Sequence, residues 1–173
     1  MIKDIYLAAG CFWGAQKYFD QFTGVMYTEV GYANGSTENP SYEDVKYRHT
    51  GHAETVKIVY DSDIINLEKI LKLYFYVIDP YTLDQQGEDI GVQYRTGIYY
   101  SDEEDKDTII KIYDEEQAKS EEKFVVEVRP LEKFYTAEEY HQKYLIKNPE
   151  GYCHISGNYF KVQEMIDRGE FEL

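Results

Sequence analysis

Cys11 is the residue whose type and surroundings most directly suggest chemistry in this chain. It stands in the run Gly10-Cys11-Phe12-Trp13-Gly14, between a predicted strand and a predicted helix. The first turn of a helix leaves backbone N–H groups unpaired, and these favour a thiolate there. Phe12 and Trp13 would give the sulfur an apolar wall, and the glycines allow backbone and substrate to approach closely. A single cysteine beside aromatic residues is more often a buried structural residue, so the helix start and the glycines are what favour function.

Glu54 and His52 are candidates for moving a proton. Glu54 opens an apolar predicted strand, and a desolvated carboxyl group at the edge of a β-rich core stays protonated and can act as an acid. A solvated carboxylate is the commoner state of an isolated glutamate. His52 is either a general base or a hydrogen-bonded turn residue, and its position favours the turn.

Two predicted loops and the C-terminal segment add further polar groups. Tyr42 and Tyr94 lie in or beside the loops, where each phenol either donates a hydrogen bond to a substrate oxygen or packs against the sheet. Asp89 could accept a substrate N–H or cap a turn. Cys153 lies on a segment without clear periodicity, from which it could reach a distant thiol and resolve it, or remain an ordinary reduced thiol.

The composition excludes several classes of partner. The 173 residues include 33 acidic and 18 basic side chains, for a formal charge of −15. Nucleic acids and anionic membranes require a basic face, so neither is an expected partner. No signal peptide and no apolar run near ~20 residues is apparent, which predicts a cytoplasmic protein. In a reducing cytosol a static disulfide is not expected, and no His and Cys pair has zinc-site spacing, so we expect no metal and no bound cofactor.

The elements that must position these residues alternate between strands and helices. Period and propensity predict strands at 4–9, 25–32, 55–60, 94–100 and 124–128, and helices at 12–22, 67–78, 102–120 and 136–148. Asn66 is the predicted N-cap of the second helix, and Thr136 with Glu139 would form a capping box for the last. Residues 33–47 and 81–93 are predicted loops.

The connections predict the fold class. Several links between strands are too short for a crossover helix, which favours an α+β fold with a mixed, mostly antiparallel sheet. We therefore expect a two-layer sandwich with a ferredoxin-like core, added loops and an irregular C-terminal tail. The length fits a single domain, 1–173, in which residues from about 149 form the tail that carries Cys153.

Taken together, the motifs resemble the peptide methionine sulfoxide reductase A family. The resemblance covers residues 5 to about 155 in the family's order. It rests on Gly10-Cys11-Phe12-Trp13-Gly14, Gly31-Tyr32-Ala33-Asn34-Gly35, Asn39-Pro40-Ser41-Tyr42, Thr50-Gly51-His52-Ala53-Glu54, residues 86–95, Tyr140-His141-Gln142 and Gly151-Tyr152-Cys153. Each fragment is weak evidence alone, and the set is highly specific.

The resemblance implies a role for each residue on the substrate side. Cys11 would attack the sulfur of methionine sulfoxide, while Phe12 and Trp13 form the apolar pocket for the S-methyl group. Asp89 would position the substrate backbone. The implied substrates are the S epimer of methionine sulfoxide, free or in oxidised proteins and peptides, so that the protein repairs oxidative damage.

The resemblance also implies how oxygen leaves and how the thiol is restored. Glu54 would protonate the sulfoxide oxygen, with Tyr42 and Tyr94 hydrogen-bonding it, because that oxygen leaves poorly until protonated. Cys11 would become a sulfenic acid. Cys153 would then form a disulfide with it, and thioredoxin or another dithiol would act as the external reductant.

This sequence departs from the family pattern at a few places. Gln16 stands where many members carry Glu, which would leave a possible contact near Cys11 neutral. Asn34 replaces a commoner Gly, a small change at a left-handed turn position. No third cysteine follows Cys153, which indicates a two-cysteine cycle, and residues from about Ser156 match no family pattern.

Two other functions are compatible with the same residues. A Cys–His hydrolase or acyl transferase would use Cys11 and His52, with the imidazole within hydrogen-bond reach of the sulfur. A non-catalytic module would bind methionine side chains between tyrosine-lined loops.

Overall fold

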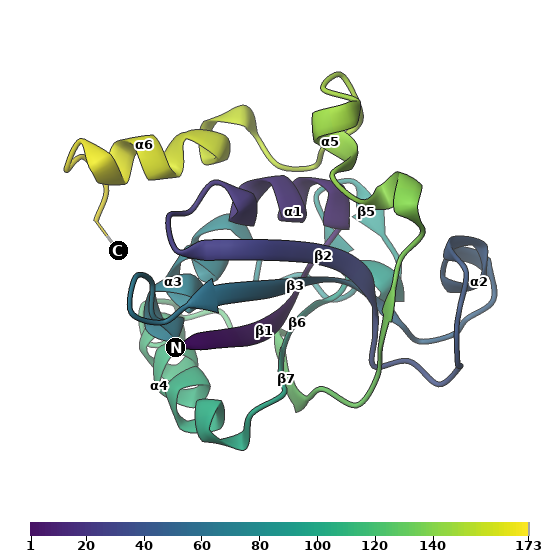
Figure 1. Ribbon diagram of the computed structural model, residues 1–173. Coiled ribbons are helices and arrows are strands. Elements are labelled where there is room, and N and C mark those ends of the chain that lie inside the picture. Colours follow the sequence, from purple (N-terminus) through teal and green to yellow (C-terminus); the bar gives the residue numbers. More distant parts are fainter. Residues whose placement is uncertain (173) are drawn as a thin grey trace.

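The computed structural model describes residues 1–172 and contains a six-stranded sheet (Figure 1). Its strands are β1 (Ile2–Ala9), β2 (Val25–Ala33), β3 (Ala53–Asp61), β6 (Thr96–Tyr100), β7 (Glu127–Pro130) and β8 (Phe134–Thr136), in the order β7-β6-β1-β3-β2-β8. Among the strands of this sheet within residues 1–172, β6 and β7 pair in parallel and the other neighbours pair antiparallel. A separate two-stranded hairpin pairs β4 (Gln85–Gln86) with β5 (Asp89–Ile90). The predicted α+β class and the mixed, mostly antiparallel sheet are confirmed.

Six α-helices accompany the sheet in the described part of the chain. They are α1 (Phe12–Asp20), α2 (Tyr42–Tyr47), α3 (Leu67–Val77), α4 (Lys106–Gln117), α5 (Tyr144–Lys147) and α6 (Val162–Asp167). Short 3-10 helices are η1 (Val92–Tyr94), η2 (Glu103–Asp105), η3 (Glu139–His141) and η4 (Gly157–Lys161). Within residues 1–172, none of the helices has the length and apolar character needed to cross a membrane.

The four strands at the centre of the sheet follow the pattern of a split βαβ unit. Along the chain the order is β1-α1-β2-β3-α3-β6, and across the sheet it is β6-β1-β3-β2. Because β1 and β2 both run antiparallel to β3, they are parallel to each other and need the crossover helix α1 between them.

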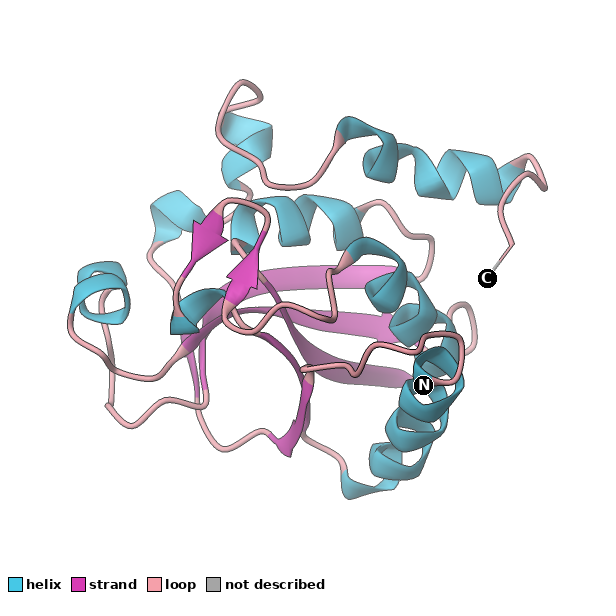
Figure 2. Ribbon diagram, turned by 180° about the vertical axis from the view of Figure 1, so that it is seen from behind, coloured by secondary structure: helices cyan, strands magenta, loops and turns pink. Residues whose placement is uncertain are grey.

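The sheet is not the flat layer that a two-layer sandwich implies, and this expectation needs correction. Figure 2 shows the strands curling strongly into a half-barrel. Side chains alternate between the two faces of a strand, and the face away from α1 and α3 carries a small cluster of Tyr6, Ala8, Ala33, Ala53 and Tyr99, with Leu131 and Phe134 packed against it. Three members of this cluster are alanines, and Leu131, between β7 and β8, packs against it together with Phe134 of β8.

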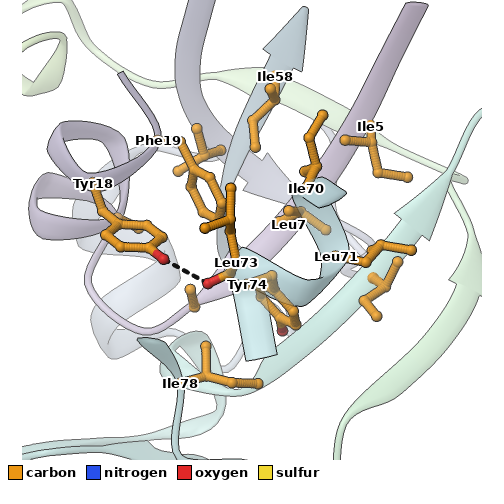
Figure 3. Close-up of a cluster of buried hydrophobic side chains, with 14 of the residues drawn as sticks. Ile5, Leu7, Tyr18, Phe19, Ile58, Ile70, Leu71, Leu73, Tyr74 and Ile78 are labelled. Carbon is orange, nitrogen blue, oxygen red and sulfur yellow. Dashed lines mark hydrogen bonds between the residues drawn. The ribbon is translucent and has the colours of Figure 1, made fainter. Parts of the chain in front are cut away.

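The main core lies between the other face of the sheet and the helices (Figure 3). Ile5 and Leu7 alternate on β1, so both point at α1 and α3. The hydroxyl of Tyr18 on α1 donates to the Leu73 carbonyl on α3 over 2.6 Å, which fixes these two helices to each other. The predicted N-cap is confirmed, because the Asn66 side chain accepts the backbone N–H of Lys69 at 2.8 Å.

Two predictions for the C-terminal third are wrong. The helix over 136–148 does not form, because Thr136 ends β8 and pairs with Gly31 of β2. Only the short η3 and α5 occupy that range. The tail is not irregular throughout, since η4 and α6 lie beyond α1 on the side away from the sheet (Figure 1). Val162 is buried there, which gives the helical tail an anchor in the main core.

Candidate active site

The sheet topology brings four predicted site residues together at one end of the central strands. Because β1 and β3 are antiparallel neighbours, the end of β1 lies beside the start of β3, and these positions carry Cys11 and Glu54. The neighbouring strands place two more residues at this end of the sheet, because Tyr42 follows the end of β2 and Tyr94 precedes the start of β6. Residues far apart in sequence therefore meet where strand ends and loops converge.

These residues line a cavity of roughly 190 Å³. The lining is Cys11, Phe12, Trp13, Tyr42, Lys46, Glu54, Asp89, Tyr94 and Tyr152. A space of this size is suited to one side chain rather than a drug-sized molecule. Larger hollows near Met1 contain no thiol. Of the residues predicted for the site, Cys153 is the one that does not line this cavity.

Cys11 is the N-cap of α1 and is only 7% exposed. Burial raises the pKa of its thiol well above the usual value, the nearby Glu54 charge adds to the rise, and a hydrogen bond from the Trp13 backbone N–H opposes it. The helix start therefore interacts with the sulfur as the sequence indicated, but desolvation outweighs it. Burial therefore favours a neutral thiol in the resting protein, while the hydrogen bond at the helix start favours the thiolate.

Glu54 is a buried carboxyl group at the same helix start. It is 2% exposed, and its Oε1 accepts the backbone N–H of Phe12 at 3.1 Å. Burial raises its pKa to about 8, while the Phe12 hydrogen bond and the charge of Lys46 act in the opposite direction. At pH 7 most of this group is a neutral carboxylic acid, which is the state that donates a proton.

Tyr42 and Tyr94 present phenols to the same cavity. Burial raises the pKa of both, so each stays protonated and able to donate at neutral pH. The backbone of Tyr42 is fixed because its N–H donates to Glu138 Oε2 at 3.0 Å, so the position of this phenol does not depend on the loop alone.

The aromatic wall is held by a histidine that the sequence analysis did not place in the site. Trp13 stacks on Tyr144 with ring centroids 3.7 Å apart, and its Nε1–H donates to His141 Nδ1 at 2.9 Å. The buried His141 ring also packs on Phe12 and Tyr42. The family-like motif around Tyr140-His141-Gln142 was the only signal in the sequence for this supporting role.

Asp89 and Tyr152 form the polar side of the cavity. Oδ2 of Asp89 is buried and accepts no hydrogen bond from the protein, so it is available to a substrate N–H. Burial and the neighbouring Asp89 carboxylate raise the pKa of Tyr152 to about 12. Tyr152 and Lys46 were both missed as site residues, although Tyr152 stands in the Gly151-Tyr152-Cys153 motif.

Cys153 packs against the helix that carries Cys11. A methyl group added to Gly14 would lie 2.8 Å from Cys153 Sγ, so a glycine is required there for the second thiol to approach. Both cysteines are free thiols, and the charge of Cys153 is among the causes that raise the pKa of Cys11. Gly10, at φ +81°, makes room for Gln86 and His154 in the same way. The glycines of the motif thus admit the C-terminal segment.

His52 and Gln16 do not contribute chemistry at this site. Nδ1 of His52 accepts the Gly35 N–H at 2.9 Å, and Nε2 is 2.8 Å from the Thr37 carbonyl oxygen. Both ring nitrogens are therefore bound to backbone, which confirms the turn interpretation and means that His52 is not a free base for Cys11.

Gln16 bonds elsewhere than at the thiol. Its side chain donates to Thr28 and accepts the Lys143 N–H at 2.8 Å, so it ties down the chain before the tail. The suggested contact of this residue near Cys11 is not observed. Among residues 1–172, no group of three or more His, Cys, Asp or Glu is placed to hold a metal ion.

Comparisons with known proteins agree over nearly the whole chain. The family model described as peptide methionine sulfoxide reductase matches residues 3–169. The peptide methionine sulfoxide reductase MsrA of Lachnoclostridium phytofermentans is 58% identical over 155 residues, which cover 90% of this chain and 93% of that protein. Among solved structures, the reduced form of Mxr1 from Saccharomyces cerevisiae superposes with a TM-score of 0.83 and 38% identity over 88% of each chain. Mxr1 in complex with Trx2 gives a TM-score of 0.59 at 27% identity, over 83% of this chain and 84% of that chain.

Proposed function

We propose a catalytic cycle for this chain, which belongs to the peptide methionine sulfoxide reductase MsrA family and is therefore an oxidoreductase that reduces methionine sulfoxide to methionine. The observation that carries the proposal is the presence of a buried thiol, Cys11, and a buried neutral acid, Glu54, in one cavity. We propose the S epimer as the substrate, in free methionine and in oxidised proteins.

In the first step the Cys11 sulfur attacks the sulfoxide sulfur. The Glu54 carboxylic acid gives its proton to the sulfoxide oxygen, and the thiol proton returns Glu54 to its neutral form. The S–O bond of the substrate breaks as a new S–O bond forms on Cys11. Methionine is released with its sulfur reduced by two electrons, and Cys11 is oxidised by two electrons to a sulfenic acid.

Glu54 suits this step because its pKa of about 8 lies close to neutral pH. A carboxyl group with an ordinary pKa would be ionised and would repel the developing negative charge on oxygen. The Tyr42 and Tyr94 phenols, both protonated at pH 7, would hydrogen-bond the same oxygen.

The aromatic side of the cavity would receive the S-methyl group. Phe12 and Trp13 line it, and Tyr144 and His141 hold the Trp13 ring by stacking and by a hydrogen bond. The free Oδ2 of Asp89 would accept a backbone N–H of the substrate. An apolar wall facing a set of hydrogen-bond donors fixes the orientation of the sulfoxide.

In the second step the Cys153 thiol attacks the Cys11 sulfenic acid. A disulfide forms, and the hydroxyl group leaves as water. A dithiol of the thioredoxin type would then reduce the disulfide by exchange. The likeness to Mxr1 in its complex with Trx2, a thioredoxin, supports this choice of reductant. Residues 1–173 would act as one domain, with the tail supplying Cys153.

The test is a reaction with less than one equivalent of methionine sulfoxide in the absence of reductant, followed by peptide mapping. We expect methionine and a Cys11–Cys153 disulfide, which lowers the mass by about two units for the two hydrogens lost. The Cys153→Ser variant should form about one equivalent of methionine and then stop. Continued turnover of this variant with thioredoxin would rule out Cys153 as the resolving cysteine.

A further inference from the structure

His154 is a half-buried histidine that the cycle above does not use. It follows Cys153 directly and lies against both glycines of the Cys11 motif. A methyl group on Gly14 would lie 2.8 Å from Cys153 Sγ and 3.5 Å from His154 Nδ1. The thiol and the ring nitrogen therefore pack against the same point on α1.

The hydrogen bonding of His154 determines which ring nitrogen carries the proton. Nε2 is 3.0 Å from the carbonyl oxygen of Ala9, which can only accept a hydrogen bond, so Nε2 bears the hydrogen. In the neutral ring, Nδ1 then has a free lone pair. This Nδ1 is buried and has no hydrogen-bond partner in the protein. A buried acceptor without a partner is costly, and this one lies beside Gly14, as Cys153 Sγ does.

We propose that His154 Nδ1 is the general base that activates Cys153 in the disulfide-forming step of the proposed function. Nδ1 takes the thiol proton as Cys153 Sγ attacks the Cys11 sulfur. The S–O bond of the sulfenic acid breaks, and Glu54 protonates the departing hydroxyl group to give water. The imidazolium of His154 then passes its proton through solvent to the Glu54 carboxylate, so that both groups regain their starting states.

The surroundings of Cys153 and His154 explain why Cys153 needs a base. Burial raises the pKa of Cys153, whose thiol donates to the Ile155 carbonyl, so little thiolate forms unaided. Burial also lowers the pKa of His154, which keeps the ring neutral at pH 7.

The other groups facing this pair come from three elements. Asp89 of β5 is the charged group that acts on both residues, and its charge favours the imidazolium once formed. Lys17 of α1 acts on Cys153. Gln86 of β4 packs near the His154 ring without a charge, since both would contact a methyl group on Gly10. Among the groups named, His154 Nδ1 is the one that lies with Cys153 Sγ against Gly14.

The test measures the two chemical steps separately in His154→Gln. Glutamine can still donate to the Ala9 carbonyl through its amide but cannot take a proton. We expect an unchanged rate of methionine formation in the first turnover, and disulfide formation slowed by about 100-fold or more at pH 7. The difference in the rate of disulfide formation between His154→Gln and the unmodified chain should shrink as the pH rises toward 9, because solvent then ionises the Cys153 thiol. His49→Asn, at an exposed histidine with left-handed backbone, is the control and should match the unmodified chain in both steps.

Disulfide formation at the same rate and with the same pH profile in His154→Gln would overturn the inference. If that variant does not fold, the pH profile of the unmodified chain decides. A rate that falls off only on the acid side, below the pKa of a histidine, supports a base, whereas a rate that climbs about tenfold per pH unit from 6 to 8 overturns it. An unmodified chain that forms no methionine would refute the proposed function and the inference with it.

Discussion

Replacing Glu54 by glutamine should slow catalysis and stabilise the fold at the same time. Glutamine keeps the oxygen that accepts the Phe12 N–H but has no proton to give. General acid catalysis contributes about 10²–10⁴-fold, so the first-turnover rate should fall by that factor, or about 3–5 kcal/mol in the barrier. The rate of the unmodified chain should itself decline above pH 8, as the Glu54 carboxyl ionises, and that decline should be absent from the variant.

Glu54→Gln should lose activity but gain stability against unfolding. Glu54 ionises near 4.5 when exposed and at about 8 in the fold, because of burial. A raised pKa in the folded state means that the stability present below pH 4.5 is lost as the pH rises toward 8, by at most about 5 kcal/mol. Glutamine does not ionise, so Glu54→Gln should unfold at a higher urea concentration than the unmodified chain at pH 8, with little of that advantage at pH 4.

The assays are single-turnover formation of methionine and urea unfolding at pH 4 and pH 8. Glu121→Gln makes the same chemical change at an exposed glutamate and should alter neither quantity. A Glu54→Gln variant with full activity would show that this residue is not the proton donor. A variant that loses stability at pH 8 would mean that Glu54 is ionised and favourably solvated in the fold, and the argument for a neutral acid would be wrong.

Three further substitutions test other parts of the structure. Gly14→Ala would place a methyl group 2.8 Å from Cys153 Sγ. Disulfide formation should therefore slow at least tenfold, while first-turnover methionine formation is largely kept. Gly157→Ala is the matched control, because a methyl group there has nothing within 4 Å. Asp89→Ala removes a charged acceptor worth about 1.5 kcal/mol, so KM for a blocked peptide substrate should rise about tenfold with kcat little changed; an unchanged KM would contradict its role in binding. Asn66→Ala removes a helix N-cap and should cost about 1 kcal/mol in urea unfolding at unchanged activity.

The parts of the fold that depend on local signals could be predicted from the sequence. The N-cap at Asn66, the left-handed Asn34 at φ 55° and the helix after Cys11 are confirmed. Each is encoded within a few neighbouring residues. Thr136 carries an equally good local signal, but its backbone pairs with Gly31 about a hundred positions earlier. Strand pairing at that separation overrides a capping box, and no short-range pattern reports it.

The site residues also divide into those that local sequence predicts and those that depend on the fold. Residue type and neighbourhood led to Cys11 and Glu54, because a thiol at a helix start and a carboxyl group on an apolar strand are unusual in themselves. The extent to which Cys11 is buried could not be predicted from its neighbours in sequence, because residues from distant segments, such as Tyr94 and Tyr152, line the same cavity. Lys46 and Tyr152 look like ordinary surface residues, and only the folded chain brings them to the cavity.

The segment that bears Cys153 is fastened on both sides. Before it, the Gln142 side chain bonds both backbone groups of Val30 in β2, and the Lys143 N–H bonds Gln16. After it, Gln21, the C-cap of α1, accepts the N–H of Gln163 and donates to the carbonyl of Tyr159. The segment around Cys153 is therefore a loop whose two ends are both held by hydrogen bonds. In the proposed cycle, a dithiol protein that displaces Cys153 would move a loop whose two ends stay bonded, and closing such a loop costs less entropy than ordering a free terminus.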